Sequence, residues 1–195
     1  MTQIIAHRRN TISELKGTPI EYGVEMDIRS TGDRLILHHD PFVEGDEFEK
    51  WLDHYNHKTL ILNVKEEGIE YCVKELVDAR GITDYFFLDL SFPFLVKMVN
   101  GGERRAAIRF SEFESLETVL MLAGRCDWVW VDCFTRLPID AESFSKLQEA
   151  GFKTCIVSPE LQQHSPEQIA AYRRYLAKEG VVYDAVCTKR PDLWS

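Results

Sequence analysis

The sequence predicts an α/β fold, a compact (β/α)8 barrel in which parallel strands form a ring surrounded by helices. Eight short runs of apolar, β-branched or aromatic residues alternate with longer segments of helical period. This alternation indicates parallel strands joined by right-handed crossovers, and eight strands suit a closed barrel. A doubly wound open sheet is the alternative, but no glycine-rich nucleotide-binding loop follows the first strand.

The expected strands are short, and the first helix is expected to be short as well, because little chain separates the first two strands. After the second strand, a turn at residues 30–34 and a further short strand at Leu35–His39 predict a small hairpin excursion. The eight barrel strands are expected at Gln3–His7, Gly23–Ile28, Thr59–Lys65, Tyr85–Leu90, Arg105–Arg109, Trp128–Asp132, Lys153–Val157 and Ala185–Thr188.

The expected helices follow from apolar periodicity and from residues typical of helix ends. Asp140 and Ser165 are expected to be N-caps. Glycines at positions 81, 124, 151 and 180 are expected to end helices. The clearest helices are predicted at Asp46–Tyr55, Glu70–Arg80, Pro93–Asn100, Ser115–Ala123, Ala141–Ala150 and Pro166–Glu179.

Length and composition favour one domain over residues 1–195, with a core that needs no disulfides. The formal net charge is −9 and no basic tract is present, which argues against nucleic acid as a partner. No apolar run has the length of a membrane helix, and the first residues do not resemble a signal peptide. The expected location is therefore the cytoplasm. The oligomeric state is left open.

The five cysteines are expected to be reduced core residues. Their number is odd, no two have CxxC spacing, and most lie in apolar runs, so neither a disulfide framework nor a zinc site is indicated. They are Cys72, Cys126, Cys133, Cys155 and Cys187.

Two carboxylates mark the end of the second expected strand. Glu25 and Asp27 are two residues apart, so both project to the same face, where the working groups of a barrel gather at the carboxyl ends of its strands. Paired carboxylates repel each other unless they share a proton or hold a cation, and a hard divalent ion takes oxygen ligands. The alternative is a polar pair that serves only solubility.

Two histidines also end expected strands. His7 and His39 could act as acid and base in one catalytic cycle, because histidine titrates near neutral pH. His38 alternates with His39 and is expected to point elsewhere. The alternative for each histidine is a structural role.

Four of these segments, in this order, resemble the glycerophosphodiester phosphodiesterase family. They are the first strand with Ala6-His7-Arg8, the pair Asn10-Thr11, the segment Glu25-Met26-Asp27, and His39-Asp40 after the turn. The resemblance is strong over roughly the first 65 residues and weak at Thr188-Lys189-Arg190-Pro191. It implies a TIM barrel of the phospholipase-C-like type, and this chain would be an atypical short member.

The resemblance implies a metal-dependent phosphodiesterase that acts on a small phosphodiester. Glu25 and Asp27 would hold one divalent cation, most simply Mg²⁺ or Ca²⁺, with Mn²⁺ as an alternative. His7 and His39 would carry out proton transfer, in an order that stays open. Arg8 and Lys65 would bind the phosphate of the substrate.

The chain departs from the family pattern at several positions. Asn63 stands where the family has its third metal-binding carboxylate; its amide oxygen could serve, or Glu66 or Asp89 could supply the missing oxygen. Arg9 replaces a glycine, and Lys189 stands where an aspartate is usual. A catalytically impaired barrel that only binds a phosphorylated ligand is the alternative function, and a structural or interaction protein on the same scaffold is a third.

Overall fold

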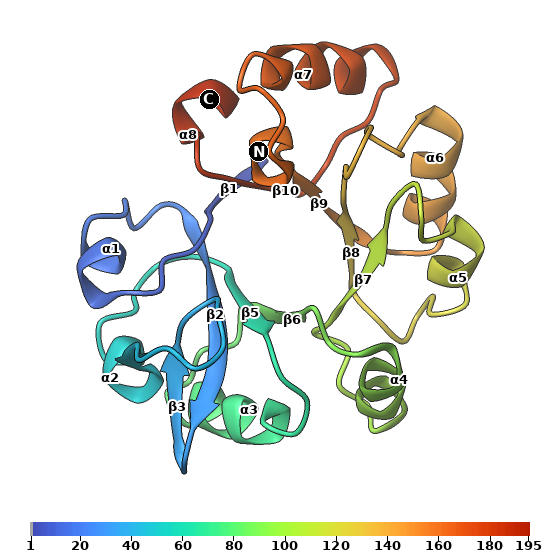
Figure 1. Cartoon of the computed structure of the whole chain (residues 1–195). Helices are drawn as coiled ribbons and strands as arrows, with labels where there is room; N and C mark the ends of the chain where they lie inside the picture. Colours follow the sequence, from blue (N-terminus) through green and yellow to red (C-terminus); the bar gives the residue numbers. More distant parts are fainter. Residues whose placement is uncertain (1) are drawn as a thin grey trace. The chain divides into compact units, whose positions relative to one another are not determined.

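The computed structural model of the protein describes residues 2–195, which fall into two compact units. The first unit holds residues 2–5 and Met98–Ser195, and the second holds Ala6–Lys97. Figure 1 shows both units in the colours of the sequence. The prediction of one domain over residues 1–195 remains a prediction.

The second unit is built on a sheet with the strand order β4-β3-β2-β5-β6. Strands β2, β5 and β6 are parallel, whereas β3 is antiparallel to both β2 and β4. The register pairs Asp27 on β2 with Asn63 on β5, which brings polar side chains of adjacent strands together. The strands are β2 (Gly23–Thr31), β3 (Arg34–Leu37), β4 (Asp46–Glu47), β5 (Leu60–Val64) and β6 (Tyr85–Leu88).

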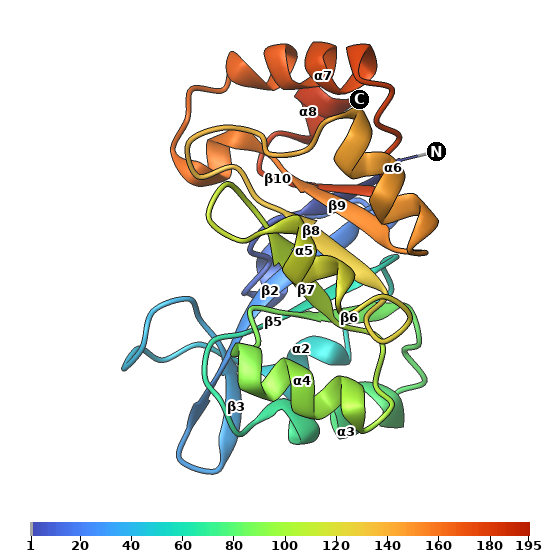
Figure 2. The same ribbon diagram turned by 90° about the vertical axis from the view of Figure 1, so that its right-hand side faces the viewer.

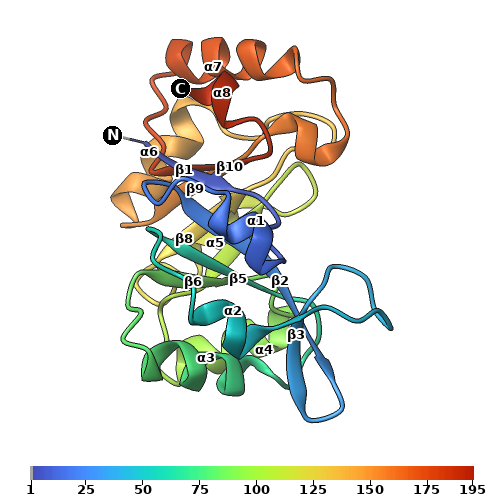
Figure 3. The same ribbon diagram turned by 90° about the vertical axis from the view of Figure 1, so that its left-hand side faces the viewer.

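Strand β2 is longer than expected because it continues into a hairpin with β3. Gly32 has a φ of 62°, a left-handed conformation that suits the tight turn between the two strands. Figure 3 shows this hairpin, in blue, extending beyond the other strands of its unit.

The helices of the second unit are α1 (Ile12–Lys16), α2 (Phe48–Leu52), α3 (Glu70–Ala79) and α4 (Phe92–Asn100), and the boundary between the units falls within α4. The first helix is as short as expected. It is stabilised by a capping box, in which Thr11 and Glu14 each accept a hydrogen bond from the other's backbone N–H. The core side chains beneath these helices include Phe48, Trp51 and Phe86, all fully buried.

The first unit has the strand order β1-β10-β9-β8-β7, and β7 to β10 are parallel. Figure 2 shows its helices α6 and α7, in orange and red, beside the strands that they connect. Its strands are β1 (Gln3–Ala6), β7 (Ala107–Phe110), β8 (Trp128–Val131), β9 (Lys153–Val157) and β10 (Ala185–Thr188). Its helices are α5 (Leu116–Leu120), α6 (Ala141–Glu149), η1 (Pro159–Gln162), α7 (Gln168–Lys178) and α8 (Pro191–Trp194).

Several sequence expectations are corrected at element ends. The helix expected from Asp46 begins only at Phe48, because Asp46–Glu47 pairs with β3 as a strand. Ser165 is not the N-cap of α7, which begins at Gln168 after Glu167. Asp140 is confirmed as an N-cap, since its side chain accepts a hydrogen bond from the N–H of Ser143.

The four glycines expected to end helices, at positions 81, 124, 151 and 180, all have positive φ angles, in agreement with the prediction. All five cysteines are free thiols. Four are buried, but Cys72 is exposed, because it lies on the outward side of α3; its assignment to the core was wrong. Burial raises the pKa of the Cys133 thiol to about 12, which makes it unreactive. Among residues 2–195, no helix has the length and apolar character needed to span a membrane.

Candidate active site

The two carboxylates of β2 lie side by side and fully buried. Glu25 and Asp27 are each 0% exposed, as the alternation of the strand requires for residues on one face. Oε2 of Glu25 accepts a hydrogen bond from the backbone N–H of Arg8 over 2.8 Å, and Oε1 accepts one from Nδ2 of Asn63 over 2.7 Å. Buried carboxylates need such partners, because desolvation of an unpaired charge is costly.

The environment of Glu25 favours its protonated form. Burial, with the neighbouring charge of Asp27, raises the pKa of Glu25 to about 7, although the hydrogen bonds from Asn63 and Arg8 and the charge of Lys65 act in the opposite direction. The two buried carboxylates therefore repel each other when both are ionised. Such a pair attracts a cation.

Asp27 is held by a side chain to which the sequence analysis gave no role. Asn10 donates from Nδ2 to Oδ2 of Asp27 over 2.9 Å, and its Oδ1 accepts the backbone N–H of Asp27 over 2.8 Å. The two hydrogen bonds together fix the orientation of the carboxylate. Asn10 was included in the family resemblance, and its short distance in sequence from His7 and Arg8 was the available signal.

The two basic side chains that the resemblance assigns to phosphate binding lie beside the carboxylates. Nε of Arg8 lies 3.5 Å from Oδ2 of Asp27, and the Arg8 side chain is 38% exposed. Nζ of Lys65 lies 3.3 Å from Oδ1 of Asp27 and 3.1 Å from Oδ2 of Asp89. Arg8 can therefore reach an anion in solvent while it remains beside the buried pair.

Two residues of the site have strained backbone conformations. Arg8 has a φ of 52° and Asp89 a φ of 58°, both in the left-handed region that non-glycine residues seldom adopt. At Arg8, this conformation accompanies the hydrogen bond from its N–H to the Glu25 carboxylate. Strain of this kind concentrates at functional sites, where the surrounding structure maintains it.

His7 lies next to Glu25. Its Nε2 is 3.7 Å from Oε2 of Glu25, and only 13% of the side chain is exposed. The structure thus places this histidine directly on the carboxylate pair.

His39 follows β3 and is more accessible, with 41% of its side chain exposed. Its Nδ1 lies 2.8 Å from Oδ1 of Asp40, and this hydrogen bond lowers the pKa of Asp40. An ionised carboxylate only accepts hydrogen bonds, so Nδ1 carries the proton and Nε2 is left to exchange one with a ligand. His38 contacts the same residue through its backbone, because its Nδ1 accepts the N–H of Asp40.

Arg29 fixes the backbone at His39, and sequence reasoning missed it. Its Nε and Nη2 both donate to the carbonyl oxygen of His39, over 3.0 and 2.9 Å, and its Nη1 donates to the carbonyl of Lys65 over 3.2 Å. One guanidinium therefore connects the chain segments that carry two predicted site residues. In the sequence, Arg29 is simply the next residue of a strand, with nothing to distinguish it.

The oxygen atoms at the carboxylate pair suit one hard cation. Oδ1 of Asn63 is buried without a hydrogen-bond partner, so it is available as a neutral ligand beside Glu25 and Asp27. Within residues 2–195, no three His, Cys, Asp or Glu side chains form a group that could hold a metal. An amide oxygen is also a ligand that hard cations accept.

The other two candidates for a third ligand are already engaged. Glu66 accepts hydrogen bonds from the backbone N–H and the hydroxyl of Ser30, on the hairpin. Asp89 is paired with Lys65. Which of the three completes the oxygen ligands stays a prediction.

The fold defined above is that of an α/β protein with parallel strands and a polar site where β2 and β5 lie side by side. Comparison with solved structures shows which proteins have a similar fold. No family model and no curated protein matches the sequence. The structure is similar to that of a putative glycerophosphoryl diester phosphodiesterase from Agrobacterium tumefaciens strain C58, with a TM-score of 0.75 and 16% identity, over 99% of this chain and 95% of that one.

Two further solved structures agree. One is a glycerophosphodiester phosphodiesterase from Agrobacterium tumefaciens strain C58 (TM-score 0.72, 15% identity, 100% of this chain and 99% of that one). The other is a putative glycerophosphodiester phosphodiesterase from Galdieria sulphuraria (TM-score 0.73, 16% identity, 100% and 96%). The resemblance indicated by the motifs is thus confirmed at the level of the fold. The alignments cover almost all of this chain and of each of these structures. Closure of the strands into a complete (β/α)8 ring stays a prediction.

Proposed function

We propose that the protein is a metal-dependent phosphodiesterase, a phosphoric diester hydrolase that cleaves a small phosphodiester. The observation that carries the proposal is the gathering of Glu25, Asp27, Arg8, Lys65 and His7 through contacts of 2.8 to 3.7 Å. This set combines anionic ligands for a cation with cationic groups for a phosphate. The fold shared with glycerophosphodiester phosphodiesterases supports the same reaction class.

The chain's own cations would bind the phosphate. Arg8 presents a planar guanidinium that matches two phosphate oxygens, and Lys65 adds a point charge. Both side chains are paired with the buried carboxylate of Asp27. An incoming phosphate would replace carboxylate oxygens by phosphate oxygens as their partners. A neutral ligand would gain nothing from this exchange, which favours an anionic substrate.

A divalent cation, Mg²⁺ or Ca²⁺ and in second place Mn²⁺, would be held by Glu25, Asp27 and Asn63. When bound, it would stabilise negative charge on the phosphoryl oxygens. The unpartnered Oδ1 of Asn63 and the proximity of two buried carboxylates support this assignment.

His7 and His39 would transfer protons at opposite sides of the phosphate. One would take the proton of the nucleophile, a hydroxyl next to the phosphate or a water, and the other would protonate the departing alcohol. His39 is prepared for this exchange by Asp40, which orients its ring. His7 lies at the carboxylate pair, with Nε2 3.7 Å from Oε2 of Glu25.

The alternative function is a catalytically impaired barrel that binds a phosphorylated ligand. One observation favours it: Asn63 points its amide nitrogen, rather than its oxygen, at Glu25. In that orientation, the amide N–H donates a hydrogen bond to the Glu25 carboxylate without a cation. It also occupies the side of the carboxylate on which a cation would bind.

A substrate screen with matched variants tests the proposal. Purified protein is incubated with glycerophosphodiesters, sugar-phosphate diesters and nucleotide-linked glycerols, with each divalent cation and with a chelator. We expect turnover that depends on the cation and is lost in Asp27→Asn, together with at least an order of magnitude of cation affinity. Asp33→Asn, on the exposed hairpin turn, is the control for loss of one charge. Cation binding without turnover of any diester would favour the impaired barrel.

A further inference from the structure

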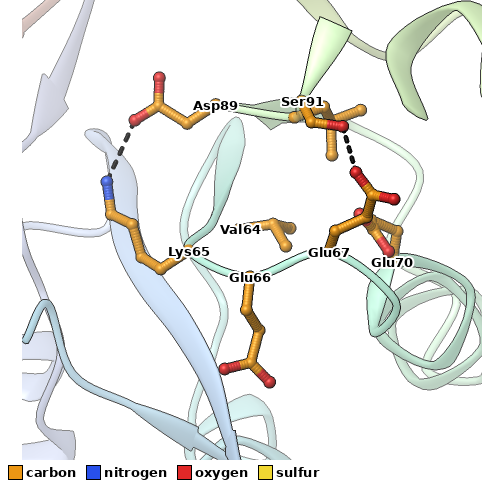
Figure 4. Close-up of a pocket in the computed structure, with 8 residues that line it drawn as sticks. Val64, Lys65, Glu66, Glu67, Glu70, Asp89 and Ser91 are labelled. Carbon is orange, nitrogen blue, oxygen red and sulfur yellow. Dashed lines mark hydrogen bonds and ion pairs between the residues drawn. The ribbon is translucent and has the colours of Figure 1, made fainter. Parts of the chain in front are cut away.

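The parallel strands β5 and β6 have a pocket at each end. The pocket at their carboxyl ends belongs to the candidate active site, and Figure 4 shows Lys65 in it, directed at Asp89. The other pocket, of about 370 Å³, opens at the amino ends of the same strands. It is lined by residues 55–58, which precede β5, and by residues 82–84, which precede β6. Its volume is in the range of pockets that hold small molecules.

The two rings that line this second pocket are held in place. Tyr55 stacks on the buried Trp51 with ring centroids 5.9 Å apart, and its ring centroid lies 5.9 Å from that of His57. The Tyr55 hydroxyl donates a hydrogen bond to the carbonyl oxygen of Lys58. Nε2 of His57 lies 3.0 Å from the carbonyl oxygen of Thr18, which can only accept, so Nε2 carries the proton. Because these contacts exist without a ligand, little side-chain order has to be gained on binding.

Lys58 and Asp84 bring opposite charges to the lining of this pocket, and both are exposed. No acidic side chain among residues 2–195, Asp84 included, forms an ion pair with Lys58. Asp84 is oriented by the hydroxyl of Thr59, which donates to its Oδ2 over 2.8 Å. Burial, with the nearby charge of Asp84, raises the pKa of Tyr55, so the hydroxyl near this carboxylate stays neutral. The pocket therefore offers one ammonium and one carboxylate that do not neutralise each other.

The charges of the pocket indicate which kind of ligand it would bind. A simple anion would be attracted by Lys58 and repelled by Asp84, and a simple cation would meet the reverse. A zwitterion satisfies both side chains, because it carries a carboxylate and an ammonium group on one small molecule. The neutral Tyr55 and the aliphatic Ile82 add apolar surface, which an apolar side chain of the ligand could cover. An α-amino acid combines these three chemical groups.

We propose that the pocket at the amino ends of β5 and β6 binds a free α-amino acid with an apolar side chain. Lys58 pairs with its carboxylate and Asp84 with its ammonium group. The proposal goes beyond the proposed function and does not rest on it, because none of the lining residues takes part in the proposed reaction. It gives the second compact unit a ligand site at the strand ends opposite to those that carry the chemistry.

Titration calorimetry with three matched probes tests the proposal on the whole chain. L-leucine carries both charged groups, L-leucinamide lacks the carboxylate, and N-acetyl-L-leucine lacks the ammonium group. We expect leucine to bind about threefold or more tightly than either derivative, since partly exposed ion pairs contribute modestly. Leucine that binds no better than its two derivatives, or that does not bind, would overturn the proposal.

Two charge-removing variants assign each end of the ligand to its partner. Lys58→Gln should abolish the preference for leucine over leucinamide but retain the preference over N-acetylleucine. Asp84→Asn, which keeps an oxygen for the hydroxyl of Thr59, should have the opposite effect. Lys16→Gln and Asp33→Asn each remove one exposed charge of the same unit outside the pocket, and both should retain both preferences. A pocket variant that retains both preferences would overturn the assignment.

Asp27→Asn separates this proposal from the proposed function. The variant should lose cation-dependent turnover but bind leucine with unchanged affinity, because it leaves the pocket residues as they are. Loss of leucine binding in Asp27→Asn, with none in Lys58→Gln or Asp84→Asn, would place the amino acid at the candidate active site and overturn the proposal. Failure of the unchanged protein to cleave any diester, with leucine binding intact, would remove the proposed reaction and support the amino-acid site.

Discussion

Asn63 donates a hydrogen bond from Nδ2 to Oε1 of Glu25 over 2.7 Å, so a neutral residue compensates one of two buried carboxylates. Its Oδ1 has no hydrogen-bond partner. A half-turn of the amide exchanges these two atoms and would point an oxygen at the place where a cation is needed. The same residue can therefore stabilise the metal-free protein with its nitrogen and a metal-bound form with its oxygen.

We expect Asn63→Asp to tighten divalent cation binding, because a third carboxylate adds negative charge and an oxygen ligand. The same change should lower stability in a chelator, since the aspartate removes the donor to Glu25 and adds a buried charge. Titration calorimetry and urea unfolding measure the two effects. Asp89→Asn is tested in parallel: weaker cation binding there, with no gain in Asn63→Asp, would show that Asp89 is the third ligand.

Glu25 gives a pH dependence of stability. Its pKa is about 7 in the folded protein and near 4.5 when unfolded, so the folded state binds more protons between these values. The contribution of this group is therefore complete below about pH 4.5 and is lost as the pH rises through about 7. In a chelator, Glu25→Gln should become progressively more stable than the unchanged protein between about pH 5 and pH 8. A constant stability difference in urea unfolding across that range would contradict the shift.

Both histidines are expected to be essential. His7→Ala and His39→Ala should each lower turnover on the order of 10²-fold or more, and the pH profile of the unchanged protein should be bell-shaped around neutrality. The measurement needs a substrate with a poor leaving group, because a good leaving group departs without protonation by a general acid. His54→Ala, at a position after α2, is the control. Near-normal turnover in either site variant would make that histidine structural.

Arg29 is expected to act by positioning. Arg29→Lys keeps the charge but replaces three separate donors on two carbonyls by a single ammonium, so His39 and Lys65 lose their common support. We expect kcat to fall on the order of tenfold, with a smaller change in KM, because misplaced catalytic groups slow the reaction step. Lys50→Arg on α2 is a matched exchange in the opposite direction and should change neither constant. A pure rise in KM would instead indicate that Arg29 supports substrate binding.

Gly45 lies in the segment that follows His39 and packs closely against the backbone of Leu37. A Cβ at this position would lie 2.3 Å from the carbonyl oxygen of Leu37, a backbone atom that moves only with its strand. Gly45→Ala should therefore destabilise the protein by about 1–3 kcal/mol, as overpacking does. Gly17→Ala has an ordinary φ of −82° and should be neutral or stabilising by up to about 1 kcal/mol. Chemical unfolding of both variants provides the comparison, and equal stabilities would contradict the predicted clash.

The sequence was sufficient where local pattern determines structure. Alternation in β2 was enough to place Glu25 and Asp27 on one face, and the glycines after α3 and α6 end their helices as predicted. Periodicity failed at Asp46–Glu47, whose polar side chains fit a helix start, because pairing with β3 decides their conformation. Strand pairing depends on residues that are distant in the sequence, so no local pattern contains it.

The site was predicted in its residue types more fully than in its contacts. Motif and spacing identified Arg8 and Lys65, but not that both are paired with Asp27. Arg29 was missed because its role depends on two backbone carbonyls, which every residue has. A side chain that binds backbone atoms has no partner side chain that could be recognised in the sequence. Such interactions can be identified only from the structure.

The compact unit Ala6–Lys97 contains every residue that we assign to the reaction, from His7 to Asp89. These residues are therefore synthesised before any part of Met98–Ser195. The hydrogen bonds that orient them, such as those of Asn10 to Asp27 and of Arg29 to His39, also join residues within this stretch. Domains commonly fold in the order of their synthesis. The candidate site can thus take its local form early, and a translational pause near residue 98 would interrupt synthesis only after its components are present.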